Sequence, residues 1–454
     1  MGAKPIKVGE EIIIELEDLA TGGDAVGRVD GFVIFIPGGI PGEKVKVEIT
    51  QVKKSYGRAK IVEVIEQSAE RVQPSCQEDE DCGGCQISYF DYQAQLKYKR
   101  KIVVDTIERI AKLTEVKVNP VKGMENPFFY RNKAQFPVAK QGDKVITGFY
   151  ALGTHKLIEL EDCKIQHPLI NRVLREAIDL IEEHQVSIYD EKQHKGLLRH
   201  LVVRVGVCTN QAMLIFVTKN EEFSAGVEIA TELLERIPEL VSVNQNINPE
   251  ETNIVLGRRT KQLVGEDHII DYIGPIKYKI SPLAFFQVNT LQAKILYDQV
   301  VEYAQLSGTE RVLDAYCGVG SIALYLARFA KEVWGIEVIG EAIEAAQENA
   351  QLNEIDNCQF EVGKVREVLP RLKKELRPEV IVVDPPRKGC HQEVLATFVE
   401  LEPERIVYVS CDPASLARDL KYLTEAGYQL EEIQPVDMFP QTYHIENVAL
   451  LKKQ

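Results

Sequence analysis

The sequence predicts a multidomain protein with a small N-terminal β-barrel, an α+β middle region and a C-terminal α/β domain. Residues 6–66 form short runs of alternating apolar and polar residues separated by turns such as PGGIPGE, which is typical of a small barrel. From about residue 275, four apolar strand segments alternate with helical segments, which predicts a doubly wound, mostly parallel sheet. We expect domains at 1–66, 67–274 and 275–454.

The composition is that of a globular protein, with 454 residues, of which 45% are hydrophobic and 27% are charged. A chain of this length can bury several cores. It has no apolar run long enough to cross a bilayer, and MGAKPIKVGEE lacks an apolar signal segment. We therefore expect a cytoplasmic protein with no membrane partner, and a monomer. Nine cysteines are too few for a disulfide scaffold in this chain, which favours metal binding or catalysis.

The net charge of −15 argues against a nucleic-acid partner only if charge is evenly distributed. It is not, because residues 44–60 carry six basic side chains and one acid, and a second basic cluster lies at 97–101. A solvated face is the commoner meaning of such runs, but small barrels often bind oligonucleotides along one face. The run GRVDGFVIFIPGGIPGEKV resembles a TRAM domain, an OB-like RNA-binding module, and so implies an RNA partner.

The segment PSCQEDEDCGGCQ holds Cys76, Cys82 and Cys85 at C-x5-C-x2-C spacing. Three thiols this close, with two glycines in the last interval, suit a zinc or iron–sulfur site. Cys163 in LEDCKIQHP is the leading candidate for a fourth ligand. The spacing does not separate zinc from a [4Fe–4S] cluster, and a loop of reduced thiols is the alternative to both.

The middle region begins after a helical pattern at 87–112 and contains the strand segment YRNKAQFPV. Arg131 and Lys133 lie two apart in this segment, so both point to one face of the strand. That arrangement suits a surface that faces RNA phosphates, although an exposed polar edge explains it equally well.

The segment VLDAYCGVGSIALYLA joins a strand to a helix through a glycine-bearing turn. Gly318 lets the backbone approach a ligand, and the turn opens a helix N-terminus. Glu337 closes the next strand, twenty-three residues after Asp314, where an acid accepts hydrogen bonds from a ribose. Such a turn also serves dinucleotides or plain packing, but the whole pattern resembles the class I S-adenosylmethionine-dependent methyltransferases.

The next two strands each end in a reactive side chain. In VVDPPRKG, Asp384 is held at the mouth of the sheet because proline restricts itself and the residue before it. In VYVSCDPASLARDL, Cys411 follows the last strand residue. A D-P-P segment could also serve amino-group methylation, so adenine is an alternative substrate. A free cysteine is most often a small buried hydrophobe.

Methylation of a pyrimidine at C5 would require a nucleophile such as this thiol. Thiolate addition to C6 activates the otherwise poor nucleophile C5, and a base must then remove the C5 proton. Glu446, near His444 in FPQTYHIENVALL, is the candidate base, and Gln287 in SPLAFFQVN, beside Phe285, can hydrogen-bond the ring. Each has an ordinary explanation alone, as a surface acid, a helix cap or a core aromatic. The occurrence of all these residues together, in this order along the chain, favours methylation of a pyrimidine at C5.

The motifs FFQVN, DAYCGVG, VVDPPRKG, YVSCDPASLARDL and TYHIENV resemble those of the RNA uracil-C5 methyltransferase family, over essentially the whole chain. Members with a TRAM domain and four cluster cysteines are the 23S ribosomal RNA enzymes. The resemblance implies Cys411 as nucleophile and Glu446 as general base. It implies that Gln287, Tyr316, Glu337 and Asp384 surround S-adenosylmethionine and the uracil. The residue patterns described above add Asp314 and Gly318 as candidates for the methyl-donor site, and Phe285, Arg131 and Lys133 as candidates for RNA contact. The resemblance also implies a [4Fe–4S] cluster on Cys76, Cys82, Cys85 and Cys163.

Two alternatives stay open. The first is the same chemistry on tRNA, against which the barrel and the cysteine site argue, because tRNA enzymes of this family typically lack both. The second is an RNA-binding assembly factor whose methyltransferase domain is structural, against which the intact Cys411 and Glu446 argue. The acidic run EDED at 78–81 is unusual for a loop that faces RNA.

Overall fold

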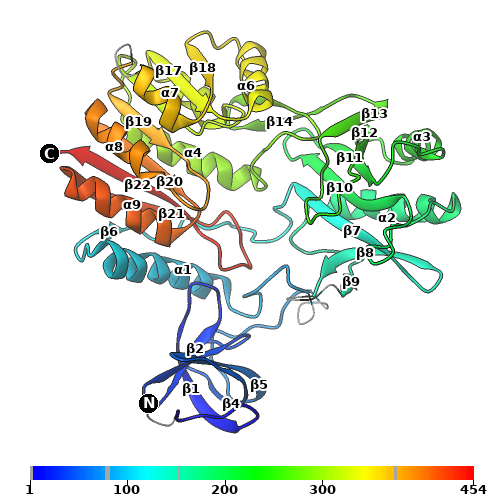
Figure 1. Ribbon diagram of the computed structural model, residues 1–454, viewed down its shortest axis with the longest axis horizontal. Helices are drawn as coiled ribbons and strands as arrows, with labels where there is room; N and C mark the ends of the chain where they lie inside the picture. Colours follow the sequence, from blue (N-terminus) through cyan, green and yellow to red (C-terminus); the bar gives the residue numbers. More distant parts are fainter. Residues whose placement is uncertain (1–3, 77–81, 152–153, 155, 373–375) are drawn as a thin grey trace.

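The computed structural model describes residues 4–76, 82–151, 154, 156–372 and 376–454. Figure 1 shows a small N-terminal barrel projecting from a larger body, in which a middle sheet and a C-terminal sheet lie beside each other. No helix among the described residues is long and apolar enough to span a membrane. The acidic run at 78–81 lies outside the described residues.

The N-terminal unit is a closed barrel with strand order β1-β2-β3-β5-β4, which confirms the predicted fold. Alternation of buried and exposed residues along its strands fills the interior with one set of side chains, among which Ile34, Ile36 and Val47 are fully buried. The strands are β1 (Glu11–Leu19), β2 (Ala25–Val29), β3 (Phe32–Ile36), β4 (Lys44–Val52) and β5 (Tyr56–Glu66).

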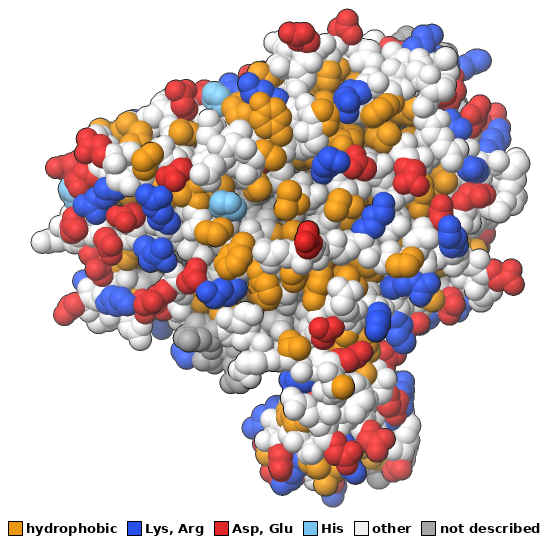
Figure 2. Space-filling view, turned by 180° about the vertical axis from the view of Figure 1, so that it is seen from behind, with side chains coloured by type: hydrophobic (Ala, Val, Ile, Leu, Met, Phe, Trp, Pro, Cys, Tyr) orange, Lys and Arg blue, Asp and Glu red, His pale blue; other side chains and the backbone are white. Residues whose placement is uncertain are grey.

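Most basic side chains of the barrel are paired with acids of the barrel itself. The pairs are Arg28–Glu17, Lys44–Glu66, Lys46–Glu11, Arg58–Asp24 and Lys60–Glu48. Figure 2 shows blue and red side chains interspersed on this projecting lobe. Exposed pairs add little stability, but they reduce the positive field that the barrel offers to an RNA. The surface formed by residues 44–60 therefore carries less uncompensated positive charge than the sequence of this run suggests.

The middle unit is a seven-stranded sheet with order β13-β12-β11-β10-β7-β8-β9. Helices α2 (Pro168–Glu183) and α3 (Gly226–Arg236) pack on one face. The hairpin of β14 (Ile269–Ile273) and β15 (Ile276–Ile280) covers the other face and shares a core with the C-terminal domain. The sheet strands are β7 (Lys133–Gln141), β8 (Lys144–Tyr150), β9 (Leu157–Glu159), β10 (Leu198–Gly206), β11 (Gln211–Thr218), β12 (Leu240–Ile247) and β13 (Arg259–Gly265).

The C-terminal unit is an eight-stranded sheet with order β18-β17-β16-β19-β20-β22-β21-β6. The first five strands in this order are parallel, β22 is antiparallel to both of its neighbours, and β6 is parallel to β21. The strands are β6 (Lys117–Val118), β16 (Arg311–Ala315), β17 (Glu332–Glu337), β18 (Cys358–Val362), β19 (Val380–Val383), β20 (Arg405–Ser410), β21 (Tyr428–Val436) and β22 (Glu446–Lys453).

Helices cover both faces of this sheet, as predicted for a doubly wound fold. One face packs against α4 (Thr290–Ala304), α5 (Ser321–Ala327) and α6 (Gly340–Leu352). The other face packs mainly against α7 (Val365–Leu372), α8 (Gln392–Leu401) and α9 (Pro413–Glu425). The C-terminal α/β domain of the sequence analysis is thereby confirmed.

Residues that precede the middle sheet in the chain also belong to the C-terminal sheet. Helix α1 (Tyr92–Thr106) continues as a π-helical turn, η1 (Ile107–Ala111), and packs against α9. Strand β6 then pairs with β21 at the sheet edge. This differs from the expected boundaries, which assigned all of 67–274 to the middle domain. A two-residue strand carries no periodicity that a sequence pattern could reveal.

Candidate active site

A cavity of about 910 Å³ opens at the carboxyl ends of the parallel strands of the C-terminal sheet, the expected ligand position in this kind of fold. Lys133 lies near this cavity but is not among the residues that line it. The cavity gathers ten of the side chains singled out in the sequence, namely Arg131, Phe285, Gln287, Asp314, Tyr316, Gly318, Glu337, Asp384, Cys411 and Glu446.

Cys411 and Glu446 face each other across two neighbouring strands. Ser410, the last residue of β20, pairs with Asn447 of β22, and the two strands are antiparallel. The next position along the ladder therefore places Cys411 opposite Glu446. Electrostatic coupling of the thiol to the Glu446 carboxylate agrees with this register. Residues that are thirty-five positions apart in the chain thus converge on one point of the cavity.

The turn that carries Cys411 is fixed by a helix cap. Asp412 accepts a hydrogen bond of 2.8 Å from the backbone N–H of Ser415, and Pro413 occupies the first helical position of α9. Both features are favourable at a helix start. Cys411 is therefore held between the end of a buried strand and a capped helix, with its side chain half-buried at the cavity wall.

The turn after β16 builds the part of the cavity next to β17. Tyr316 has a φ of 67° and Gly318 a φ of 54°, and a left-handed conformation is costly for tyrosine, so such positions concentrate at functional sites. Gly318 donates a 3.2 Å backbone hydrogen bond to Glu337. Both carboxylate oxygens of buried Asp314 have no hydrogen-bond partner among the described residues. The turn therefore presents unsatisfied acceptors to a ligand with hydrogen-bond donors.

The loop that carries Gln287 is held by the middle unit. Asn132 donates to the Gln287 carbonyl oxygen at 2.8 Å, and the guanidinium of Arg204 donates to the Ala284 carbonyl oxygen. Phe285, which lines the cavity, is 64% exposed, more than a core position explains. An exposed aromatic ring beside a polar cavity offers a surface on which a base can stack.

Burial and neighbouring charges shift the pKa values of three groups at the centre of the cavity, Glu446, Asp384 and Cys411. Burial raises the pKa of Glu446 well above its usual range, and the Asp384 carboxylate raises it further. Burial also raises the pKa of Asp384 to about 6. The Cys411 thiol has a pKa raised to about 11 by burial and by the two carboxylates, while Arg387 lowers it. Titratable groups shifted together in a cavity are typical of catalytic sites.

Arg387 and His444 were not assigned a role from the sequence, although both lie in quoted motifs. The Arg387 guanidinium nitrogen Nη2 lies 3.2 Å from Nδ1 of His444. Burial and this arginine lower the pKa of His444 to about 4, so the imidazole is neutral. Arg387 follows Asp384 by three residues, directly after the two prolines. This position next to the D-P-P turn is the sequence signal by which Arg387 could have been predicted to lie at the site.

Arg131 and Lys133 lie together with the buried Arg204 at the edge of the cavity. Burial, with a contribution from the charges of Arg204 and Arg131, lowers the pKa of Lys133 to about 7. Burial also lowers the pKa of Arg204 to about 10, and its Nε has no hydrogen-bond partner among the described residues. Three cations packed together in this way would be stabilised by an anion.

The four predicted ligand cysteines converge on a small cavity of their own, which all of them line. Cys163 is buried, with a pKa raised to about 11 by burial, and the thiols of Cys82 and Cys76 contribute to this shift. Apolar side chains, including Phe149, complete the walls. Gly84 lines both this cavity and the larger one, so the cysteine-bearing loop borders the candidate active site.

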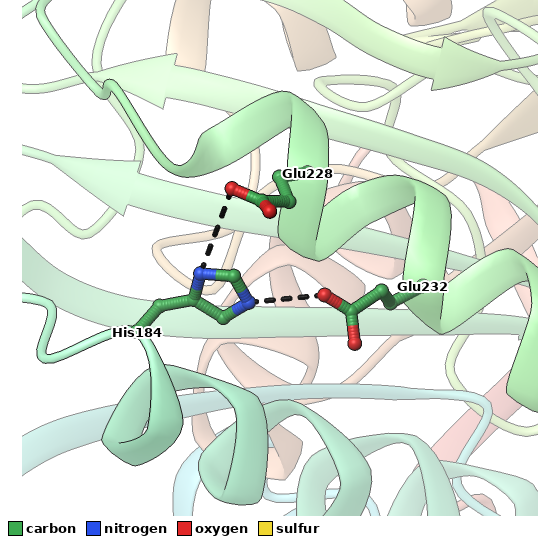
Figure 3. A group of neighbouring side chains, drawn as sticks. All are labelled: His184, Glu228 and Glu232. Carbon is green, nitrogen blue, oxygen red and sulfur yellow. Dashed lines mark hydrogen bonds and ion pairs between the residues drawn. The ribbon is translucent and has the colours of Figure 1, made fainter.

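A further group of possible ligands lies on the middle unit, between α2 and α3 (Figure 3). The ring of His184 lies between two carboxylates, with Nε2 3.0 Å from Glu232 and Nδ1 3.8 Å from Glu228. A single ion binds only one nitrogen of an imidazole, whereas here each nitrogen faces a different acid. Arg236 also pairs with Glu232 at 3.4 Å. These contacts are those of an ion-paired link between two helices.

Comparison with known proteins identifies relatives along the whole chain. A family model described as tRNA (uracil-5-)-methyltransferase matches residues 91–454, and a TRAM domain model matches residues 5–62. An uncharacterized RNA methyltransferase of Halalkalibacterium halodurans is 45% identical, over 99% of this chain and 98% of the relative. Another from Clostridium tetani is 45% identical, over 98% of this chain and 97% of the relative.

The structure of Pyrococcus abyssi tRNA (uracil-54, C5)-methyltransferase in complex with S-adenosyl-L-homocysteine is similar to this one. The TM-score is 0.77 at 30% identity, and the match covers 96% of this chain and 99% of that chain. The chain thus shares both the fold and the domain order of a methyltransferase with a bound product of the methyl donor. It belongs to the tRNA (uracil-5-)-methyltransferase family and is an S-adenosylmethionine-dependent RNA methyltransferase with an N-terminal TRAM domain.

Proposed function

We propose that the protein methylates C5 of a uridine in 23S ribosomal RNA through a covalent bond between Cys411 and C6 of the base. The observation that carries the chemistry is the register of β20 and β22, which places Cys411 opposite Glu446 at the edge of one cavity. Nitrogen methylation needs no nucleophilic thiol, so this pairing favours the pyrimidine over adenine.

The residues of the first turn fit the methyl donor, S-adenosylmethionine, which supplies the methyl group when bound. Glu337, at the end of β17, has the position of an acid that binds a ribose. The unsatisfied oxygens of Asp314 can accept hydrogen bonds from donors of this ligand. Gly318 has no atom within 4 Å of the place where a Cβ would lie, so the backbone leaves room for the ligand there.

Cys411 and Glu446 would act on the uracil in turn. The Cys411 thiol would release its proton to solvent and the thiolate would form a bond to C6, which makes C5 a carbon nucleophile; C5 would then take the methyl group as the bond between that group and the sulfonium sulfur of the donor breaks. Ionised Glu446 then accepts the C5 proton, the double bond between C5 and C6 reforms, and the bond from C6 to sulfur breaks. Gln287 and Asp384 would orient the ring through its carbonyl and N–H groups. Arg387 stabilises the ionised forms of both Cys411 and Glu446.

The target base reaches this cavity only when it is turned out of the folded RNA. Phe285 offers a surface for stacking near the mouth. Arg131, with Lys133 and Arg204 behind it, would bind a phosphate of the same strand, because an anion offsets the repulsion among these cations. Phosphate contacts of this kind fix the position of the strand without reading its sequence.

A tRNA substrate is the second candidate, favoured by the match to the Pyrococcus abyssi enzyme, which is named for tRNA. That match covers 96% of this chain and therefore includes most of the barrel. The presence of the barrel thus does not exclude a tRNA substrate. Mapping 5-methyluridine in ribosomal RNA and tRNA with and without the gene distinguishes the two. Loss of the modification from neither RNA would support a structural role in RNA assembly instead.

Single-turnover methyl transfer tests the covalent step. Cys411→Ala should transfer no methyl group and form no adduct. Glu446→Gln should accumulate a protein–RNA species that survives denaturing electrophoresis, because the adduct forms but the C5 proton cannot leave. RNA that contains 5-fluorouridine should trap the wild type in the same way. Cys208→Ala, at an exposed cysteine of the middle unit, is the matched control. An adduct with Cys411→Ala would overturn the assignment.

We also infer that Cys76, Cys82, Cys85 and Cys163 hold an iron–sulfur cluster. Their convergence on one apolar cavity is the supporting observation, because thiolates in an apolar shell are suitable cluster ligands. Four thiolates also suit zinc, so the iron content of the anaerobically purified protein distinguishes the two metals.

A further inference from the structure

A second cavity, of about 280 Å³, lies on the other side of Cys411. Its walls come from five places in the fold: the β1–β2 loop of the barrel at Thr21, the end of α1 and the turn η1, the segment after β19 at Arg387, the start of α9, and the segment 443–445 before β22. In Figure 1 the barrel lies below α1, next to the C-terminal domain. This cavity is therefore formed only when the barrel is docked against the body.

The two cavities meet at the reactive sulfur. Cys411, Arg387 and His444 line both of them, and the contact between Arg387 and His444 at 3.2 Å forms part of the wall between them. A molecule that placed one group in the larger cavity could therefore extend directly into the smaller one. A strand of nucleotides with one base turned out has this shape.

The chemistry of the second cavity suits a phosphate. Arg109 lines it, and no ion pair or hydrogen bond joins the Arg109 side chain to another described residue. The N-terminus of α9, a helix of thirteen residues, opens into the same space and attracts anions. The carboxylate of Asp412 also lines the cavity, but it is engaged as the cap of this helix.

A separate observation indicates a ligand with hydrogen-bonding groups. Thr106 is 1% exposed and lines the cavity, yet its hydroxyl has no hydrogen-bond partner among the described residues. Hydroxyls in helices usually bond to a backbone carbonyl of the preceding turn, and a buried hydroxyl without a partner is costly. The wall of the cavity thus contains a buried hydroxyl whose hydrogen-bonding capacity is unused by the described residues.

An aromatic ring completes the site. Tyr443 lines the cavity, and its ring lies 4.3 Å, centroid to centroid, from that of His444. A Cβ at Gly23 of the barrel would lie 3.4 Å from this ring, so the β1–β2 loop packs directly against Tyr443. The barrel therefore supports an aromatic surface on which a base can stack.

We propose that this cavity binds the nucleotide next to the target uridine in the RNA strand. Its phosphate lies between Arg109 and the N-terminus of α9, its polar groups reach Thr106, and its base stacks on Tyr443. The inference rests on the proposed function, because it needs the uridine in the larger cavity. The barrel then contributes to catalysis by shaping the wall of a subsite, in addition to any affinity from its charges.

Arg109→Gln and Thr106→Val in the full-length protein test the proposal. Lys331→Gln is the control, since the exposed Lys331 precedes the amino end of β17, whereas the larger cavity lies at the carboxyl ends of the strands. The probes are transcripts of 23S ribosomal RNA and tRNA, with uridine or 5-fluorouridine. Arg109→Gln should raise KM for the methylated RNA about tenfold with kcat within about twofold. It should also reduce the slope of log affinity against log salt by about 0.7.

Cross-linking gives a second measurement. The trapped 5-fluorouridine adduct is irradiated, digested and analysed by mass spectrometry, and the nucleotide adjacent to the fluorouridine should be attached to the peptide that contains Tyr443. The inference is overturned if the adduct forms but Arg109→Gln and Thr106→Val match Lys331→Gln in KM and salt slope. It is also overturned if the flanking nucleotides attach only at the mouth near Phe285. If the wild type forms no adduct with any transcript, the proposed function itself fails.

Discussion

The buried ion pair between Lys99 and Asp437 should contribute strongly to the stability of the catalytic unit. The Lys99 ammonium lies 2.6 Å from an Asp437 oxygen and 3.1 Å from the Phe439 carbonyl oxygen. The two charged side chains are 1% and 0% exposed. Asp437 also accepts a 2.9 Å hydrogen bond from the Tyr92 hydroxyl. These contacts join α1 to the segment that leads to His444 and Glu446.

Lys99→Met would leave the Asp437 carboxylate buried without its cation. Breaking a buried pair in this way costs about 3–5 kcal/mol, and about 2–4 °C in Tm accompanies each kcal/mol in a domain of this size, so Tm should fall by about 6–20 °C. The single tryptophan of the chain, Trp334, lies in β17, and its fluorescence therefore reports unfolding of the catalytic sheet directly. Single-turnover methyl transfer should weaken in parallel.

Two variants separate the charge effect from the loss of a side chain. Lys97→Met, on the exposed side of the same helix, should change the free energy of unfolding by no more than about 0.5 kcal/mol. Lys99→Met combined with Asp437→Asn removes both charges, keeps an acceptor for Tyr92, and should recover about half of the loss or more. A single variant within about 1 kcal/mol of wild type, or a double variant as unstable as the single one, would refute this reasoning.

Two other predictions concern the metal site and pH. Anaerobically purified wild type should contain about four iron atoms per chain and absorb broadly in the visible range. Cys163→Ser should lose both properties while Cys208→Ser keeps them, and zinc without iron would contradict the cluster. Between pH 4 and 6, folded Asp384, with its pKa near 6, binds more protons than the unfolded chain. The free energy of unfolding should therefore fall as pH rises through this range. Asp384→Asn should flatten the fall in denaturant titrations, and an unchanged slope would show that Asp384 is not the group responsible.

The fold and the contents of the larger cavity could be predicted because each signal is local. Asp314 lies in the last two residues of one apolar strand segment, Asp384 and Cys411 each follow another, and the carboxyl ends of parallel strands meet at one end of the sheet. The position of Glu446 could not be predicted from a local signal, because β22 is antiparallel and its register is fixed by pairing with β20. Its proximity to Cys411 therefore came from the family resemblance and was not derivable from spacing.

The basic runs were poor guides because charge in sequence does not show which acid lies opposite. Lys99 is buried in an ion pair, and Lys101 pairs with Asp18 of the barrel and with Asp105. The cluster at 97–101 thus largely holds α1 between the barrel and the catalytic unit. On the barrel, Lys46 is held by Glu11 of a neighbouring strand. Such partners depend on strand order, which the periodicity of a single strand does not encode.

Residues from all three units converge around Cys411, and this has a consequence for how the RNA is chosen. The groups proposed to act on the base come from the C-terminal unit, whereas Arg131 belongs to the middle unit and Thr21 to the barrel. A uracil ring is the same in every RNA, so the groups that hold it cannot distinguish one uridine from another. Discrimination must come from contacts with neighbouring nucleotides, which the outer walls of the two cavities provide. Because those walls border the reactive sulfur, a poorly matched RNA should slow the formation of the covalent bond as well as bind more weakly.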